Sequence, residues 1–314
     1  MGIVMDKKIA LLCVAFTVSG SQLPLDAAET TKPLSQAMAG PAIATQLNEL
    51  YGRRFPNCHK QDSQPAFLCS GVTLRVTLKD PANTYKVWDP SPASVASGAV
   101  AFSYLRADSN FGARAWGMNN GIILYPIFES PADKLDVDYL CAYPMDAWTS
   151  NRTAPCARHA SYDPQSRVCQ EAKITTAAQW KAAWDSRPTS TRNVQSCGFD
   201  VRDDRNAQAG PAFYQFVQAK TLLGAQGFNE QNELLVKTWP SGQPNSLPLM
   251  AFFYLADGTQ NALADARYNQ QDFYKSTHPR IVVPIIRLTL PTSPSGTAIF
   301  TYVPSDQVVT ADNP

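Results

Sequence analysis

The sequence predicts an α+β fold with mixed, mostly antiparallel sheets and a few helices. Segments with period-two apolar patterns and segments with helical patterns both occur, but they do not follow one another in the strict alternation of a parallel α/β fold. The chain has 314 residues, of which 44% are hydrophobic and 17% are charged. This composition supplies a core and is unlike that of a disordered chain.

The first half of the chain predicts one helix and four strands. The helix is expected at 43–51, within a polar stretch that contains prolines. The clearest strand is 72–78, because apolar and polar residues alternate along it. Three further short apolar runs are expected to be strands: 100–105, 122–128 and 139–143. Residues 144–172 are loop-like.

The second half predicts three helices and four more strands. A helix is expected at 176–187, where Trp180 and Trp184 are four residues apart, and another at 211–226, where Pro211 suits a first turn. A third helix is expected at 261–275. The strands are expected at four apolar stretches: 233–239, 249–255, 281–290 and 298–303.

The N-terminal residues predict export. Lys7 and Lys8 precede an apolar run at 9–18, which is too short to span a bilayer, and small residues follow near Gly20 and Ala27. This pattern is typical of a secretory signal. No second apolar stretch of about 18 residues occurs, so the sequence predicts a secreted protein, periplasmic or extracellular, without a membrane span.

These observations divide the chain into three parts. We expect a signal peptide at 1–27, a polar and partly helical N-terminal segment at 28–66, and a single α+β catalytic domain at 67–307. No internal repeat or composition shift suggests a further boundary within the last part.

The cysteines fit an oxidising compartment. Besides Cys13 in the signal segment, the chain has an even number of them: Cys58, Cys69, Cys141, Cys156, Cys169 and Cys197. We therefore expect disulfides. Six cysteines allow about 15 pairings, and the sequence does not choose among them. Short loops would favour Cys58–Cys69 and Cys156–Cys169, which leaves Cys141–Cys197.

Composition and missing motifs exclude several classes of protein. The net charge of +1 lacks the basic bias of a nucleic-acid binder, and three histidines argue against a multi-histidine metal centre. The sequence contains no Gly-x-Ser-x-Gly, no His-Glu-x-x-His and no phosphate-binding glycine-rich loop. We expect neither a metal nor a nucleic-acid partner.

Polar residues on or beside predicted strands are the candidate site. Arg75 carries a planar fork that can grip a carboxylate or a pyrophosphate, although it can also be an ordinary solvated strand residue. Gln231 and Glu233 are two residues apart, so on an extended chain they face the same way. A carboxylate beside an amide can hold a ribose hydroxyl and stabilise an oxocarbenium ion. The alternative is simply a polar beginning to a strand.

Residues 97–106 supply two further candidates. Ser103 can hydrogen-bond a catalytic carboxylate, and Tyr104, or its neighbour Phe102, can stack on an aromatic ring. The alternative is that all three are ordinary sheet residues.

Several stretches resemble the halovibrin family of secreted bacterial proteins. The similar stretches are Pro65-Ala66-Phe67-Leu68-Cys69-Ser70-Gly71-Val72, Asp89-Pro90-Ser91-Pro92, Phe102-Ser103-Tyr104-Leu105-Arg106, Asn119-Asn120-Gly121, Cys197-Gly198-Phe199-Asp200-Val201-Arg202-Asp203, Gln231-Asn232-Glu233-Leu234, Ala251-Phe252-Phe253-Tyr254-Leu255 and Val283-Pro284-Ile285-Ile286. The resemblance implies cleavage of NAD, as an ADP-ribosyltransferase or an NAD glycohydrolase.

A more distant likeness is to the cholera- and pertussis-toxin class of ADP-ribosyltransferases. In that class an arginine on an early strand binds NAD and a Glu/Gln-x-Glu pair carries the chemistry. Residues 74–77 are similar to the first motif, and 231–233 to the last. The middle Ser-Thr-Ser motif of the class has only partial counterparts, at 101–103 and at 189–191.

Together these patterns predict a secreted enzyme that breaks the nicotinamide–ribose bond of NAD. Glu233 would supply negative charge beside the ribose and Gln231 would orient the acceptor, either water or an unknown protein. Arg75 would hold a phosphate, Ser103 would position Glu233, and Tyr104 would contact the nucleotide. NAD would be the substrate. Two alternatives are an exported binding module that uses its Trp and Tyr residues without catalysis, and a secreted glycan-cleaving or lytic enzyme.

Overall fold

The computed structural model describes the following residues: 40–53, 70–77, 86–109, 111–112, 119–125, 138–152, 156, 167–202, 209–237, 248–258, 261–278 and 280–310. They all belong to one compact unit, Lys32–Pro314. The expected signal peptide at 1–27, much of the segment at 28–66, and both Cys58 and Cys69 lie outside the described residues.

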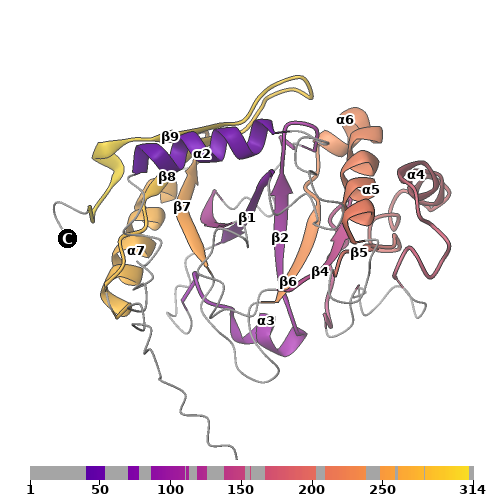
Figure 1. Cartoon of the computed structure of the whole chain (residues 1–314), viewed down its shortest axis with the longest axis horizontal. Coiled ribbons are helices and arrows are strands. Elements are labelled where there is room, and N and C mark those ends of the chain that lie inside the picture. Colours follow the sequence, from indigo (N-terminus) through magenta and orange to yellow (C-terminus); the bar gives the residue numbers. More distant parts are fainter. Residues whose placement is uncertain are drawn as a thin grey trace, which may run out of the picture. The chain divides into compact units, whose positions relative to one another are not determined.

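The described strands form one nine-stranded sheet (Figure 1). In chain order the strands are β1 (Val72–Thr77), β2 (Val100–Leu105), β3 (Asn120–Leu124), β4 (Asp138–Tyr143), β5 (Phe199–Asp200), β6 (Glu233–Lys237), β7 (Leu249–Leu255), β8 (Ile285–Thr289) and β9 (Ile299–Tyr302). Their order in the sheet is β5-β4-β6-β2-β1-β3-β7-β8-β9, and only β7 and β8 run parallel. The predicted α+β class, with a mixed and mostly antiparallel sheet, is confirmed.

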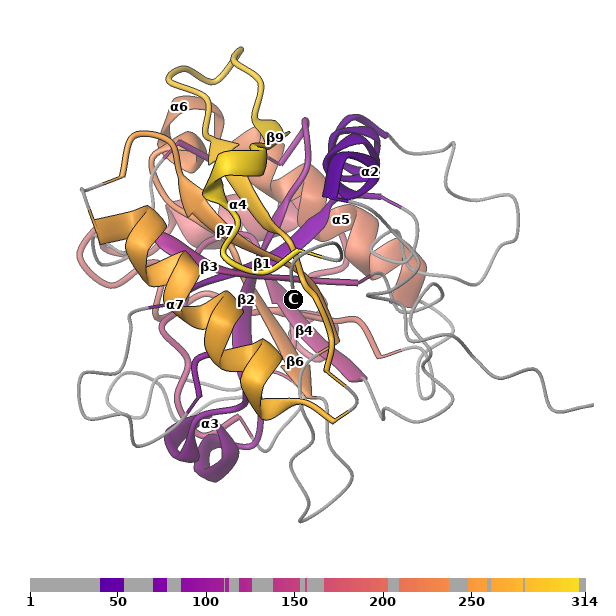
Figure 2. The same cartoon turned by 90° about the vertical axis from the view of Figure 1, so that its left-hand side faces the viewer.

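Helices pack on both faces of this sheet. Those of the described residues are α2 (Gly40–Gly52), α3 (Pro92–Ser97), α4 (Ala177–Asp185), α5 (Ala209–Leu222), α6 (Gly224–Phe228), α7 (Asn261–Ser276) and a 3₁₀ turn, η5 (Pro304–Asp306). α4, α5 and α7 share one hydrophobic core with the sheet, and α2 forms another with β1, β3, β7, β8 and β9. Figure 2 shows α7 lying across β3 and β7, which it contacts.

Among the differences from the sequence-based expectations, three stand out. The helix expected at 211–226 is two helices, because Gly224 takes a left-handed φ of 55° and separates α5 from α6. The strand expected from residue 281 begins at Ile285, directly after Pro284, which has no amide hydrogen to donate. α3 was not expected, although Ser91 caps it and a left-handed Gly98 ends it.

The disulfide pairing favoured by short loops is wrong. The structure pairs Cys141 with Cys156 and Cys169 with Cys197, with Cα–Cα distances of 5.2 Å and 5.0 Å. The expected pairs Cys156–Cys169 and Cys141–Cys197 do not form, because the chain brings the segment that begins at 167 back beside Gly198. There the Cys169 N–H donates to the Gly198 carbonyl at 2.8 Å. The third expected pair, Cys58–Cys69, lies outside the described residues.

The sheet is split between its two central strands. β1 pairs with β2 through Val72–Leu74, opposite Ser103–Leu105. The rest of β1, Arg75–Thr77, pairs with β3 on its other side, and the first half of β2, Val100–Phe102, pairs with β6. The two strands therefore diverge and leave an opening, which we call the seam.

One side chain fixes β6 beside the far half of β2. Asn232, fully buried just before β6, accepts a hydrogen bond from the Tyr104 N–H and donates one to the Tyr104 carbonyl, both at 2.8 Å. Its amide thus stands in for a main-chain pair and extends the contact between β2 and β6 beyond Phe102, the last residue of their ladder. This contact sets where β6 begins, and so where Glu233 lies.

The disulfides can be tested by non-reducing peptide mapping of the purified, oxidised protein. We expect peptides linked through Cys141–Cys156 and through Cys169–Cys197. Replacing both Cys169 and Cys197 by Ser should lower the free energy of unfolding by about 2–5 kcal/mol, measured with denaturant. A peptide linked through Cys156–Cys169 would contradict the observed pairing.

The role of Asn232 can be tested with Asn232→Asp. Aspartate keeps an acceptor for the Tyr104 N–H but turns a second oxygen toward the Tyr104 carbonyl. The buried Tyr104 carbonyl therefore loses the donor that the Asn232 amide supplies. We expect the free energy of unfolding to fall by about 2–3 kcal/mol in urea titrations. Asn229→Asp, at an exposed position three residues earlier, should change it by less than about 0.5 kcal/mol. Equal losses in the two variants would contradict this role.

Candidate functional site

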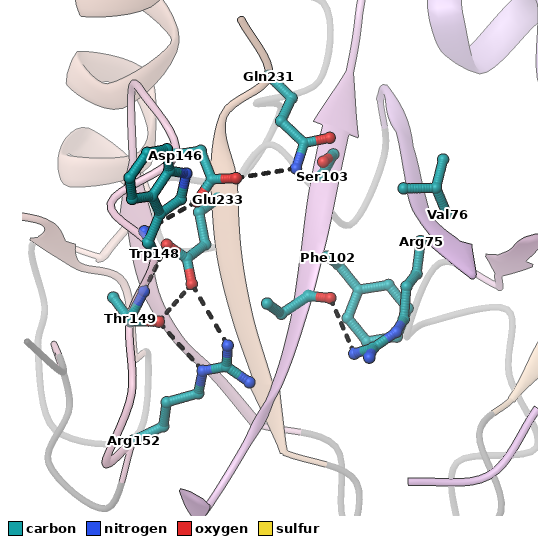
Figure 3. A pocket seen from close by; sticks show the side chains of 11 residues that line it. Arg75, Val76, Phe102, Ser103, Asp146, Trp148, Thr149, Arg152, Gln231 and Glu233 are labelled. Carbon is teal, nitrogen blue, oxygen red and sulfur yellow. Dashed lines mark hydrogen bonds and ion pairs between the residues drawn. The ribbon is translucent and has the colours of Figure 1, made fainter. Parts of the chain in front are cut away.

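A cavity of about 310 Å³ lies at the seam (Figure 3). Its walls come from β1, from β2, from the residues that lead into β6, and from the segment 146–152, which follows β4 and which we call the site loop. Four predicted site residues line this cavity: Arg75, Ser103, Gln231 and Glu233. The structure therefore brings them together from separate parts of the sequence.

The open seam is what lets Arg75 and Glu233 line the same cavity. By strand register Arg75 shares a face with Ile122, whereas Glu233 pairs with Tyr143 and points to the opposite face. In a continuous sheet these side chains would lie on different sides. Here the Arg75 Nη1 reaches across the opening and donates to the Ala101 carbonyl at 3.2 Å, so both residues line one cavity.

Tyr104 does not line the cavity. It follows Ser103, so it points to the opposite face of β2. There it is fully buried, with its ring edge-on to Phe213 at 4.9 Å between centroids and its hydroxyl donating to the Ser70 carbonyl at 2.9 Å. The structure gives Tyr104 a core position, in contrast to the nucleotide contact expected of it.

Ser103 lines the cavity but does not contact the Glu233 carboxylate as expected. Its hydroxyl donates to the Asn232 carbonyl at 3.2 Å, so it holds the main chain one residue before Glu233. Of the two partial counterparts of the middle toxin motif, 101–103 line the cavity. Residues 189–191 lie in turns after α4 and do not line it.

The Glu233 carboxylate is buried, with 3% of the side chain exposed, and is surrounded by donors from the site loop. Oε2 accepts hydrogen bonds from the main-chain N–H groups of Ala147 at 3.1 Å and Thr149 at 3.4 Å. Oε1 is hydrogen-bonded to the Thr149 hydroxyl and lies 3.8 Å from Nη2 of Arg152. Dashed lines in Figure 3 mark the side-chain contacts.

The direction of one hydrogen bond follows from chemistry. Arg152 Nε lies 3.1 Å from the Thr149 hydroxyl oxygen, and a guanidinium can only donate. The hydroxyl therefore accepts from Arg152 and gives its own hydrogen to Glu233. Every one of these contacts offers hydrogen or positive charge to the carboxylate, and so favours its ionised form.

Burial and a second carboxyl group act in the opposite direction. Loss of solvent and the nearby charge of Asp146 raise the pKa of Glu233 to about 7. Burial also raises the pKa of Asp146, whose carboxylate accepts from the Trp148 N–H at 2.9 Å and from Gln231 Nε2 at 3.0 Å. The Asp146 N–H in turn donates to the Gln231 carbonyl at 2.9 Å, so the site loop and the predicted pair are tied together.

The site loop is held in an unusual conformation. Trp148 and Asn151 have left-handed φ angles of 50° and 45°, which non-glycine residues adopt at a cost in energy. Trp148 lines the cavity although 52% of its surface is exposed. The Cys141–Cys156 disulfide closes a ring around the whole loop. Strained backbone held in this way is typical of functional sites.

Sequence reasoning missed the site loop. Asp146, Trp148, Thr149 and Arg152 all lie in residues 144–172, which lack any periodic pattern. One signal was present, because Cys141 and Cys156 bracket the loop, but it becomes informative only when the correct pairing is known. Among the described residues no group of three His, Cys, Asp or Glu side chains is close enough to hold a metal ion. No described helix has the length and apolar character needed to cross a membrane.

Comparisons with known proteins found nothing similar: no protein-family model matches the chain, and neither a curated protein nor a solved structure matches it.

The raised pKa of Glu233 predicts a pH-dependent stability. An ordinary glutamate has a pKa of 4.5, and folding raises that of Glu233 to about 7, so between these values the folded protein binds more protons than the unfolded chain. The stability contributed by this group is complete below about pH 4.5 and is lost as pH rises through 7. Glu233→Gln should therefore be more stable than wild type above pH 7, by up to about 3 kcal/mol.

Thermal and urea unfolding of both proteins between pH 4.5 and 8.5 would measure this difference, which should vanish at the acid end. Glu230→Gln changes an exposed side chain that is hydrogen-bonded to Asn193, and it should alter the free energy of unfolding by less than about 0.5 kcal/mol throughout. A Glu233→Gln protein that is less stable than wild type at pH 8 would refute the account of the buried charge.

Proposed function

We propose that this protein is an exported enzyme that cleaves the nicotinamide–ribose bond of NAD, as an ADP-ribosyltransferase or an NAD glycohydrolase. The observation that carries the proposal is the convergence of Arg75 with the Gln231 and Glu233 pair, which is far from it in the sequence, at one cavity in the split sheet. These are the residue types that a nucleotide with a pyrophosphate, a ribose and a cationic ring requires.

The proposed chemistry assigns each side chain a role. As nicotinamide leaves, the ribose acquires positive charge at its anomeric carbon, and the Glu233 carboxylate stabilises that charge. The side-chain Nε2 of Gln231 donates to the Asp146 carboxylate. The side-chain oxygen of Gln231 is therefore turned so that it can accept from a ribose hydroxyl or from the acceptor. Arg75 provides a guanidinium fork for a phosphate, and the exposed indole of Trp148 offers a flat surface for an aromatic ring.

The dimensions of the cavity suit part of NAD. At about 310 Å³ it lies at the lower end of the range of ligand pockets. We propose that it takes the nicotinamide riboside end of the molecule, while the adenosine end extends out of it. The acceptor is water in a glycohydrolase and a protein side chain in a transferase.

The two alternatives are less well supported. A glycan-cleaving enzyme places two carboxyl groups about 5–9.5 Å apart on either side of the scissile bond. Asp146 and Glu233 instead interact directly from one wall of the cavity. A binding module that lacks catalysis has no use for a buried carboxylate with a raised pKa, since such a group lowers stability.

Export and family membership are parts of the same proposal. The positive and apolar N-terminal residues support export, and the two disulfides are compatible with an oxidising compartment. The stretches similar to the halovibrin family include β2 from Phe102 onward and the residues that lead into β6, and both contribute residues to the walls of the cavity.

The proposal predicts release of nicotinamide when purified, oxidised protein is incubated with NAD. Glu233→Gln should lower the rate at saturating NAD by about 10²–10³, because the amide cannot supply the negative charge that the transition state needs. Arg75→Lys should chiefly raise KM, because an ammonium cannot form the same bidentate contact with a phosphate. Chromatographic measurement of nicotinamide would check both.

Glu230→Gln is the matched control, because this carboxylate lies one residue before Gln231 and points away from the cavity to Asn193; its rate should stay within a factor of two or so of wild type. All variants should first be shown to be folded by circular dichroism. A folded wild-type protein that releases no nicotinamide, with or without candidate protein acceptors, would instead support the binding module.

A further inference from the structure

We infer that Arg152 is a positioning residue that keeps Glu233 ionised and thereby sets the pH range in which the site is active. The inference rests on the proposed function in so far as that function needs the Glu233 charge. Arg152 was not a candidate in the sequence. It belongs to the site loop and acts through two contacts, its ion pair with Oε1 of Glu233 and its hydrogen bond to the Thr149 hydroxyl.

Arg152 is itself fixed from both sides. Its Nη1 donates to the Ala99 carbonyl at 3.1 Å, and its main-chain N–H donates to the Ser97 carbonyl. Both carbonyls lie at the junction between α3 and β2, where Gly98 ends the helix. Only 16% of the side chain is exposed. The guanidinium is therefore held in place beside Glu233 by residues that do not depend on the ligand.

Four charged or titratable side chains of the described residues lie around Glu233 or across the cavity from it. Asp146, in the site loop, raises the pKa of Glu233, and Arg152 lowers it. Tyr143, which pairs with Glu233 from β4, stays neutral because burial raises its pKa well above the usual value. Arg75 lines the far wall of the cavity. Within this set Arg152 is the cation in contact with the carboxylate, and together with the hydrogen bonds from Thr149 it offsets burial and Asp146.

Arg152 also has an opposing effect on catalysis. A positive charge 3.8 Å from the carboxylate disfavours the cationic transition state that the carboxylate stabilises. Removal of the charge should therefore slow the reaction where Glu233 becomes protonated and should not slow it where Glu233 remains ionised. A merely structural residue would instead lower the rate by the same factor at every pH.

The test compares pH–rate profiles for nicotinamide release by wild type, Arg152→Gln and Arg152→Lys. Both substitutions disturb the contact with Ala99, but only glutamine removes the charge. We expect the acid limb of the Arg152→Gln profile to move up by about one pH unit or more. Its rate should be about tenfold below wild type near pH 6, and this deficit should shrink toward pH 9. The Arg152→Lys profile should keep its acid limb close to that of wild type.

A second measurement does not depend on activity. The stability difference between proteins with Glu233 and with Glu233→Gln follows the ionisation of Glu233, and its midpoint in pH should move upward in the Arg152→Gln background. A wild type that cleaves NAD, with an Arg152→Gln profile of unchanged shape, would overturn this inference and leave the proposed function standing. A wild type inactive toward NAD would refute the proposed function, and the stability midpoint would still decide the role of Arg152: an unmoved midpoint would overturn it.

Discussion

The site depends on the removal of one carboxylate from water. Glu233 lies at the start of a central strand, and its charge is tolerated because two main-chain N–H groups, a hydroxyl and a guanidinium face it. All four come from one short segment. The strained backbone of that segment, its contacts with Gln231 and its ties to α3 are all means of presenting those donors at a fixed place. A buried carboxylate without such donors would cost several kcal/mol, about the cost of an unpaired buried charge, which explains why the donors are gathered around it.

The split in the sheet is the second constraint. A continuous ladder between β1 and β2 would separate the two faces and place Arg75 on the far side from Glu233. Instead β1 and β2 pair with each other along only half of their length. The rest of β1 stays beside β3, and the rest of β2 stays beside β6. The Asn232 amide then secures β6 against the half of β2 that remains paired with β1. The opening is thus bounded by well-paired strands, which keeps its walls rigid.

Local sequence patterns were sufficient for the architecture and for part of the site. Alternating residues and short apolar runs predicted most strands. The two-residue spacing of Gln231 and Glu233 predicted that they face the same way, and both side chains line the cavity. The misplaced features depended on contacts that are distant in sequence. Tyr104 was expected to contact a ligand, but it lies on the face of β2 that packs into the core. The preference for short disulfide loops took no account of the fold, which brings Cys169 beside Gly198. The site loop has no periodic hydrophobic pattern, because its residues contact Glu233 and do not belong to a helix or a strand.

The ring closed by Cys141 and Cys156 links the site to the environment of the chain. The ring contains Ala147, Thr149 and Arg152, the donors described around Glu233, so all three lie between two joined sulfurs. In a reducing compartment the same segment lacks this cross-link and has more conformations to lose when it orders. If the protein is exported as proposed, the producing cell synthesises it with this ring open. The positions of the donors around Glu233 would then be fixed by the disulfide only after export.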